Sequence, residues 1–343
     1  MDIAFKLTDA NDDISPRYYD VLGKLKYQFG SRHVLSAHIL QAGDDLELDP
    51  STLGDSQDGD LETGWGNTYG WLNWQAFFSP RIRARTVASA GRISRSRVGF
   101  MEELGRVRGP EFVDVSDKAH YEFVGLKQDW TVDLSDRVAL RGGFLANRLF
   151  GHYDYSNRTR DLEARPNGDL IGVTDSVDVD LEPSGTELEA YGALRFRPIP
   201  WGTAEVGLRY DRRTHTDDSD VSPRVHAMVD LGDRTTLRAG WGIYHQSQGM
   251  HELEAGDGET LFARSERANQ AAVGLEHTLP SGIKGRVELY RRTVEHPRRL
   301  YLNLWREILP FPELDGDRVR VVPAEARAKG LELLVRKESE AWN

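Results

Sequence analysis

Long segments in which apolar and polar residues alternate constrain the fold of this 343-residue chain more than any other feature. Between Thr235 and Tyr244 the odd positions are apolar, and the even positions carry polar residues or glycine; the apolar residues are Leu237, Ala239, Trp241 and Ile243. A period of two indicates a β-strand with one apolar and one polar face. The pattern recurs along the whole chain, and it predicts about fourteen strands.

The connections between these segments alternate between short and long. Short turns are expected near residues 31, 80, 136, 200, 233 and 281, and longer, mostly acidic loops are expected at 43–64, 97–118, 155–185 and 296–325. Antiparallel barrels of outer membranes have this asymmetry, with short periplasmic turns and long outer loops. The sequence therefore predicts an all-β fold, an antiparallel transmembrane β-barrel; a soluble β-sandwich is the alternative.

Composition is consistent with a barrel. Hydrophobic residues make up 39% of the chain and charged residues 29%, so no segment supplies the roughly 20 apolar residues of a transmembrane helix. A barrel hides its apolar band in the alternation, which average hydropathy does not detect. The net charge of −11 argues against nucleic-acid binding.

The polar faces of the predicted strands are rich in charge. They carry Arg141, Glu189, Arg195, Glu205, Arg209, Arg238, Arg286, Glu288 and Arg336. An Arg or Lys facing lipid near the bilayer midplane costs roughly 2–4 kcal/mol, so we expect these faces to line the lumen. Aromatic residues near strand ends are expected to form the girdles at the membrane surfaces; they are Tyr69, Trp71, Tyr153, Trp201 and Tyr244.

Several short motifs follow one another in a characteristic order over residues 186–337. They are Ser222-Pro223-Arg224, Thr236-Leu237-Arg238-Ala239-Gly240-Trp241-Gly242, His251-Glu252-Leu253, Val273-Gly274-Leu275-Glu276 and Gly330-Leu331-Glu332-Leu333. Together they resemble the TonB-dependent outer-membrane receptors. The resemblance implies a barrel of about 22 strands filled by an N-terminal plug.

The resemblance sets the expected organisation and partners. We expect residues 1–343 to be a single partial β-barrel domain, about fourteen strands of the larger barrel, without the plug domain and the C-terminal strands. It implies a monomer in the outer membrane, in contact with membrane lipid. A TonB-type energising protein would act only through a plug that this chain does not contain.

The resemblance also implies the function, a receptor for ligand uptake, with a siderophore or another scarce solute as its unidentified substrate. A passive pore or structural barrel without a specific ligand is the alternative. The sequence contains no Gly-x-Ser-x-Gly, phosphate-binding glycine loop or His-Glu-x-x-His motif, and it contains no cysteine. We therefore expect no enzyme activity and no cofactor.

Two outer loops carry the candidate ligand-binding residues. Tyr244 and His245 precede the first loop, and His251 and Glu252 lie within it, where His and carboxylate side chains near a lumen mouth suit a polar ligand or a metal chelate. Surface polarity explains the same residues. Trp305 belongs to an apolar and aromatic stretch of loop 296–325, which either folds over the pore or extends two strands above the membrane.

The acidic clusters leave two interpretations open. Clusters at 44–49, 55–62, 175–182 and 217–220 could bind Ca²⁺ through carboxylate oxygens. None has EF-hand spacing, and solvated loop charge is the preferred interpretation of these clusters, so no metal site is assigned.

Overall fold

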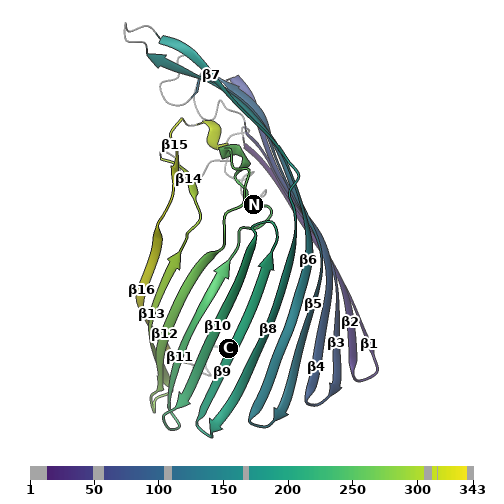
Figure 1. The fold of residues 1–343 in the computed structure, drawn as a ribbon, viewed down its shortest axis with the longest axis vertical. Coiled ribbons are helices and arrows are strands. Elements are labelled where there is room, and N and C mark those ends of the chain that lie inside the picture. The colour runs from purple at the N-terminus through teal and green to yellow at the C-terminus, as the bar shows by residue number, and fades with distance from the viewer. Residues whose placement is uncertain are drawn as a thin grey trace.

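The computed structural model describes residues 14–48, 58–103, 110–164, 170–304, 311–314 and 316–337. The strand expected within residues 2–7 and the candidate Trp305 lie outside them. In the described part, fourteen strands form one antiparallel sheet in the order β1-β2-β3-β4-β5-β6-β8-β9-β10-β11-β12-β13-β16, with β7 paired to β6. This sheet curves into a barrel wall (Figure 1).

The strands of the wall differ in length. They are β1 (Ile14–Phe29), β2 (His33–Leu48), β3 (Asp58–Ser79), β4 (Ile82–Glu102), β5 (Phe112–Ser135), β6 (Val138–Ala164), β7 (Leu170–Leu181), β8 (Ser184–Ile199), β9 (Gly202–Arg213), β10 (Asp218–Asp230), β11 (Thr235–Gln246), β12 (Glu266–Thr278), β13 (Ile283–Glu295) and β16 (Glu325–Lys337). A second, two-stranded sheet consists of β14 (Leu300–Asn303) and β15 (Arg318–Val321), and two single-turn 3₁₀ helices are η2 (Ala255–Asp257) and η3 (Pro312–Leu314). Within the described ranges, no helix is long and apolar enough to cross a membrane.

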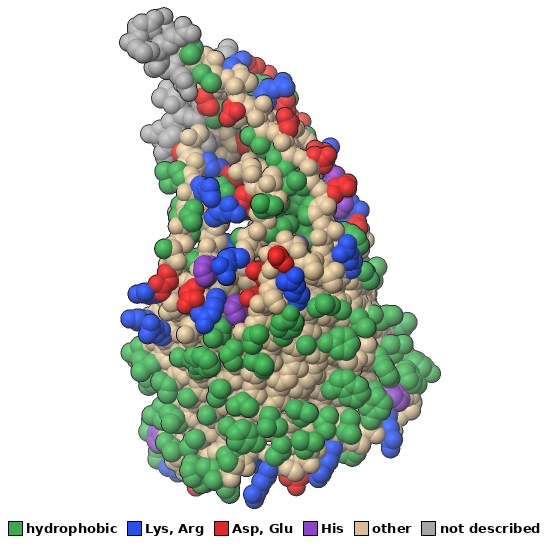
Figure 2. All heavy atoms as spheres, in the orientation of Figure 1, with side chains coloured by type: hydrophobic (Ala, Val, Ile, Leu, Met, Phe, Trp, Pro, Cys, Tyr) green, Lys and Arg blue, Asp and Glu red, His purple; other side chains and the backbone are tan. Residues whose placement is uncertain are grey.

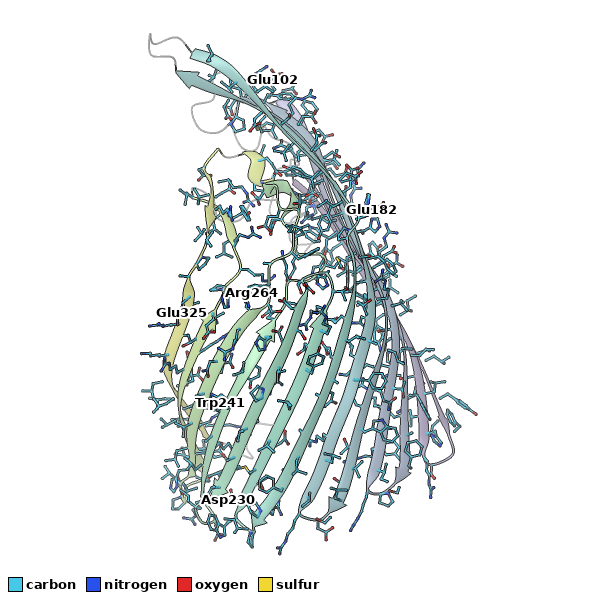
Figure 3. The ribbon with its side chains drawn as sticks, in the orientation of Figure 1. Glu102, Glu182, Asp230, Trp241, Arg264 and Glu325 are labelled. Carbon is cyan, nitrogen blue, oxygen red and sulfur yellow. The ribbon has the colours of Figure 1, made fainter. Side chains whose placement is uncertain are left out.

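The predicted short turns are confirmed. All six lie at one end of the wall, which the asymmetry of the connections identifies as the periplasmic end, the lower end in Figure 1. Asp230, beside the turn after β10, marks this end in Figure 3.

The lipid-facing surface is built from cross-strand pairs of large and small apolar residues. One row runs across seven strands in direct register, namely Leu25, Ala37, Leu72, Ala88, Leu126, Ala146 and Leu188. The four leucines are 43–73% exposed, because only lipid would cover them. Figure 2 shows the resulting apolar band around the lower half of the wall. Alternation thus produces a surface suited to a bilayer.

The aromatic girdle differs from the prediction. Trp201 lies exposed at a periplasmic turn as expected, but Trp71 stacks on His38 with ring centroids 4.7 Å apart, and Tyr153 is only 2% exposed under an outer loop. Other aromatic residues take the girdle position near the turns, where Phe78 and Trp130 stack at 5.6 Å. A position near a strand end is therefore not enough to predict a girdle residue, because only rings on the outward face of a strand can contact lipid.

The expected loops at 43–64, 97–118 and 155–185 are shorter than predicted, because the strands continue above the membrane. β6 has 27 residues, whereas β9 has 12. The acidic segment 175–182, interpreted as a loop, is mostly β7, which pairs with the outer end of β6. These extensions form a tall wall on one side of the barrel mouth (Figure 1).

Candidate ligand vestibule and lumen wall

Two outer loops fold against the inner face of the tall wall. The first outer loop, residues 247–265, joins β11 to β12 and contains η2. The second outer loop, residues 296–324, joins β13 to β16 and contains β14, β15 and η3. Two interpretations were open for the second loop, one in which it folds over the pore and one in which it extends two strands above the membrane; the structure shows a separate two-stranded sheet, β14–β15, within it.

An apolar core fixes the second outer loop to the wall. It consists of buried side chains from β3 to β6 and from the loop, all at most 3% exposed: Leu61, Met101, Val113, Val115, Tyr155, Phe311 and Leu314. Leu61, Val115 and Tyr155 occupy inward-facing positions of three strands. Above the membrane, the inward faces of these strands therefore carry apolar side chains that form a protein core.

A buried arginine reinforces this contact. Arg97 on β4 donates to Asp117 on β5 at 2.6 Å and to both Glu313 oxygens at 3.0 Å, and Tyr155 donates to Glu313 at 3.1 Å. Burial alone would lower the pKa of Arg97, but the carboxylates of Glu313 and Asp117 raise it above its ordinary value. Burial and the adjacent Glu313 likewise raise the pKa of Tyr155. The guanidinium is therefore permanently charged, as a buried pair requires.

The first outer loop is anchored through Tyr153. The Tyr153 hydroxyl donates to the Met250 carbonyl and accepts from the Leu253 N–H at 3.3 Å. Burial raises the pKa of Tyr153 to about 12, so the hydroxyl keeps its proton at physiological pH. Leu253 and Ala255 pack beside the Tyr153 ring, each 1% exposed.

Ion pairs join the two outer loops to each other. Glu252 pairs with Arg298 at 2.6 Å and Asp257 pairs with Arg318 at 2.6 Å. Glu259 accepts from Arg299 at 2.9 Å and from Tyr301 at 3.0 Å. In each pair the carboxylate comes from the first loop and the donor from the second, so the loops form a single docked unit.

The docked loops and the tall wall enclose a cavity of about 780 Å³, the vestibule. Its lining includes Trp65, Arg95, Tyr155, Asn157, Glu254 and Arg318. The Arg95 guanidinium lies 5.8 Å from the centre of the Trp65 ring and pairs with Asp117 at 3.1 Å. The size of the vestibule suits a small-molecule ligand.

Several polar groups of the vestibule wall lack partners among the described residues. Arg95 Nε and Asn157 Oδ1 are buried without a hydrogen bond in this part of the chain. The Glu254 carboxylate faces the cavity, and within the described ranges no hydrogen bond or ion pair holds it. Burial and the nearby Asp257 raise the pKa of Glu254. The Glu254 carboxylate lines the cavity and has no such partner, so it is available to a ligand or its hydration water, whereas Arg95 Nε and Asn157 Oδ1 are enclosed by the protein.

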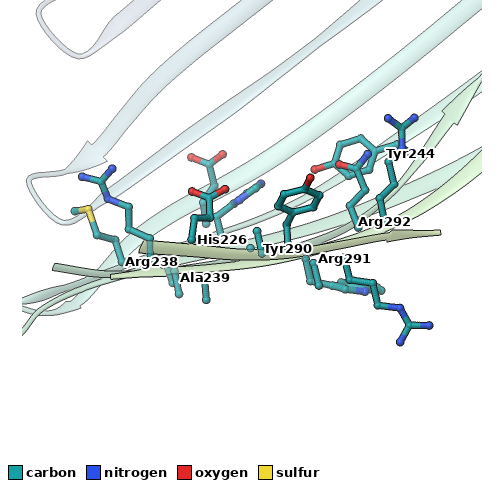
Figure 4. Close-up of a pocket in the computed structure, with 18 of the residues that line it drawn as sticks. His226, Arg238, Ala239, Tyr244, Tyr290, Arg291 and Arg292 are labelled. Atoms are coloured by element: carbon teal, nitrogen blue, oxygen red, sulfur yellow. The ribbon is translucent and has the colours of Figure 1, made fainter. Parts of the chain in front are cut away.

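A second cavity, of about 770 Å³, lies against the inner face of β9 to β13 and β16. Figure 4 shows His226, Arg238, Tyr244, Tyr290 and Arg292 on one side of the sheet, and Ala239 and Arg291 on the other. The polar side chains therefore face the lumen, as alternation predicted.

The four candidate residues within the described ranges lie at separate places in the structure. Tyr244 lies on the lumen wall, with the Arg224 guanidinium 4.5 Å above its ring. His245 is held within the wall, where Nδ1 bonds the Ser222 hydroxyl at 3.0 Å and Nε2 lies 3.7 Å from Asp220. Trp305 lies outside the described residues.

The other two candidates lie in the first outer loop. His251 packs beside Tyr121 at 5.5 Å, below the vestibule, and Glu252 accepts from the Gly249 N–H and from Arg298. The partners of Glu252 give it a structural role in the loop. Sequence reasoning missed Trp65 and Arg95 as lining residues; the spacing of Arg95 and Arg97 on one face of β4 was the available signal.

The structure also bears on whether acidic and histidine side chains could bind a metal ion. Within the described ranges, no group of three or more His, Asp or Glu side chains is arranged to hold a metal ion.

Comparison with solved structures identifies the class of fold. The outer-membrane transporter YddB from Escherichia coli superimposes with a TM-score of 0.62 at 12% identity, covering 94% of this chain and 45% of that one. The copper transporter OprC superimposes with a TM-score of 0.63 at 15% identity, covering 94% of this chain and 50% of that one. The siderophore receptor PiuA from Acinetobacter baumannii superimposes with a TM-score of 0.62 at 11% identity, covering 96% of this chain and 55% of that one. The chain thus spans about half the length of these proteins and has the fold of their barrel wall.

A family model shows the relationship directly. The model for the TonB dependent receptor-like β-barrel matches residues 6–343, and no curated protein matches the chain. The chain belongs to this family, whose barrels lie in the outer membrane. The family and the structural neighbours are receptors and transporters rather than enzymes.

Proposed function

We propose that this chain provides the membrane wall and the ligand-binding vestibule of a receptor that takes up a scarce small solute across the outer membrane. The vestibule carries the proposal, because its two outer loops are fixed to each other and to the wall before any ligand arrives. Preorganised groups reduce the entropy cost of binding. A passive pore needs an open water path and gains nothing from a docked pair of loops.

The chemistry of the vestibule supports a particular kind of ligand. The Trp65 ring supplies an apolar surface, and it is 46% exposed. Glu254 supplies a carboxylate that no hydrogen bond or ion pair within the described residues holds. A ligand that combines a flat or apolar part with a positive or hydrogen-donating group fits these groups.

Energised release is part of the proposal and is supported by the family relationship. A plug domain of the kind that the family has would fill the lumen and transmit the action of TonB, and the inward-facing Arg238 and Arg292 would give it polar contacts. The substrate class remains a matter for experiment, since the neighbours bind ligands as different as copper and siderophores.

The experiment compares binding with uptake. The receptor, purified from outer membranes, is titrated with ferric siderophores, copper complexes and short peptides, and cellular uptake is measured with and without TonB. We expect saturable binding of one class, at least tenfold weaker in Trp65→Ala and Glu254→Gln. Asp136→Asn, at an exposed periplasmic turn, is the matched control and should bind normally.

A passive pore predicts the opposite results. It would show steady ion conductance in planar bilayers, unsaturable flux and no dependence on TonB. Those three observations together would replace the receptor assignment with the pore.

A further inference from the structure

The outward surface of β12, β13 and β16 contains a shallow groove of about 550 Å³. Ala271, Val273 and Leu289 form its apolar part, and Arg291 and Lys329 form its charged end. Figure 4 shows Arg291 on the side of the sheet opposite the lumen-facing Tyr290 and Arg292. The groove therefore opens toward the membrane and is separate from the vestibule and the lumen.

The register explains why a groove forms here. Trp241, Ala271, Arg291 and Lys329 lie in one row across β11, β12, β13 and β16. The small Ala271 side chain, between the larger Trp241 and Arg291, leaves a depression in the row. One step nearer the periplasm, Val273, Leu289 and Leu331 continue the row as a purely apolar surface.

The charged end lies at the upper margin of the apolar band. Arg291 is the ninth residue of β13, which begins at Ile283 beside a periplasmic turn. A strand rises about 3.3 Å per residue and is tilted by about 35–45° from the barrel axis, so Arg291 lies about 20 Å above that turn. This height is near the upper edge of an apolar band that is about 25 Å tall. Figure 2 shows Lys and Arg side chains gathered just above the band over β13 and β16.

Neither cation forms an ion pair in the described part of the chain; Glu325, which pairs with Arg327, acts on Arg291 only through a longer-range electrostatic interaction. Arg291 and Lys329 are direct cross-strand neighbours, and no ion pair to a described carboxylate engages either side chain. Arg327, two residues before Lys329 in β16, is by contrast paired with Glu325 at 2.6 Å. Like charges directly opposite each other on a sheet are destabilising, so this pair calls for an anion from outside the protein.

We propose that this groove, the lipid groove, binds a phosphorylated lipid of the outer leaflet. The phosphate lies between Arg291 and Lys329, and an acyl chain lies along Val273, Leu289 and Leu331. Arg and Lys are the usual protein partners of phosphate, and the apolar row below matches a hydrocarbon chain rather than a soluble anion. The site is independent of the ligand carried through the receptor.

The test measures retained lipid. Receptor purified from outer membranes in mild detergent is analysed by native mass spectrometry, and lipid A with its phosphates, dephosphorylated lipid A and inorganic phosphate are then added as competitors. Arg291→Gln with Lys329→Gln should reduce retention of phosphorylated lipid at least tenfold. Arg137→Gln with Arg234→Gln, which removes two exposed arginines at the periplasmic turns, should leave retention unchanged.

A charge-preserving variant guards against misfolding. Arg291→Lys with Lys329→Arg should retain the lipid, and both double variants should keep the thermal unfolding midpoint of the delipidated receptor. Equal retention by the Gln double variant and the original protein would overturn the proposal. Equal competition by inorganic phosphate or by dephosphorylated lipid A would also overturn it, because the site would then recognise only an anion or only a chain.

Discussion

Arg97 on β4 and Glu313 in the second outer loop lie 216 positions apart, and two hydrogen bonds of 3.0 Å join their side chains. The contact ties the tall wall to the loop that closes the vestibule. Since the Arg97 side chain is 11% exposed and that of Glu313 8%, the pair is shielded from solvent. Its effect on the vestibule should therefore be much larger than that of a surface ion pair.

Removing Arg97 should release the second outer loop. In Arg97→Met the Asp117 and Glu313 carboxylates lose their shared cation, and breaking a buried pair typically costs about 3–5 kcal/mol. Every 1.4 kcal/mol changes an equilibrium constant, here that between the docked and the released loop, by a factor of about ten. Protease cleavage of this loop on intact outer membranes should therefore accelerate more than tenfold.

Arg160→Gln is the control for this change. Arg160 pairs with Glu102 at 3.0 Å and lies 3.8 Å from Glu111, but its side chain is 35% exposed, and such exposed pairs contribute about 1 kcal/mol or less. Equal cleavage rates in the two variants would show that the loop is not held by Arg97.

Tyr153→Phe should loosen the first outer loop without changing the shape of its core. The variant removes one hydroxyl and leaves the Met250 carbonyl and the Leu253 N–H without their partner. Unsatisfied buried groups cost about 1–3 kcal/mol. Hydrogen exchange should therefore become at least severalfold faster at Leu253 and stay unchanged in β1 and β2; unchanged exchange at Leu253 would contradict the anchoring role.

Acidification should also loosen the first outer loop. Burial alone would raise the pKa of Glu252, but the Gly249 N–H and the Arg298 guanidinium lower it below its ordinary value. A lowered folded-state pKa means that the stabilisation is complete above the unfolded value, about 4.5, and is lost as pH falls through the lowered pKa. Exchange at Gly249, corrected for its intrinsic rate, should rise in that range.

Glu252→Gln identifies the group responsible. It should remove this acid transition and raise exchange at Gly249 already at neutral pH. Glu254 acts in the opposite sense, since burial and Asp257 raise its pKa and its protonation relieves repulsion. An acid transition that persists in Glu252→Gln would therefore belong to another carboxyl group.

The sequence predicted the membrane-embedded part of the wall well, for a physical reason. Lipid on one side and water on the other impose a strict contrast, so residues such as Leu72, Leu126 and Leu188 mark their face unambiguously. The positions of the turns can then be predicted from where the alternation of apolar and polar residues ends. The six short turns and the antiparallel order are confirmed on this basis.

The extensions above the membrane were missed because that contrast disappears there. In β6, Asp154, Ser156 and Arg158 face water, while Tyr155 and Asn157 face the vestibule, so both faces contain polar residues. The vestibule itself depends on contacts such as that of Arg97 with Glu313. No local pattern reveals a partner 216 positions away.

The Tyr191 side chain reaches over Gly143 to Asp129, and this contact allows a test of how the lumen wall is fixed. The Tyr191 hydroxyl on β8 donates to Asp129 on β5 at 2.6 Å, and its ring passes over Gly143 on the intervening β6. A Cβ atom at Gly143 would lie 2.8 Å from the Tyr191 ring and 2.3 Å from the Gln128 carbonyl oxygen. Because the backbone oxygen cannot move aside alone, Gly143→Ala should destabilise the barrel by about 1–3 kcal/mol, measured as a lower thermal unfolding midpoint in detergent.

Gly192→Ala on the neighbouring strand is the matched control, since a Cβ atom there would meet no atom within 4 Å. Its midpoint should stay within the range of a neutral surface change, about 0.5 kcal/mol. Tyr191→Phe, which removes the hydrogen bond to Asp129 but keeps the ring over Gly143, should lose about 1–2 kcal/mol, since the Asp129 carboxylate keeps its ion pair with Lys127 at 3.7 Å. Equal midpoints for Gly143→Ala and Gly192→Ala would show that β6 can shift at this position, and the crossing would then have no part in fixing the wall.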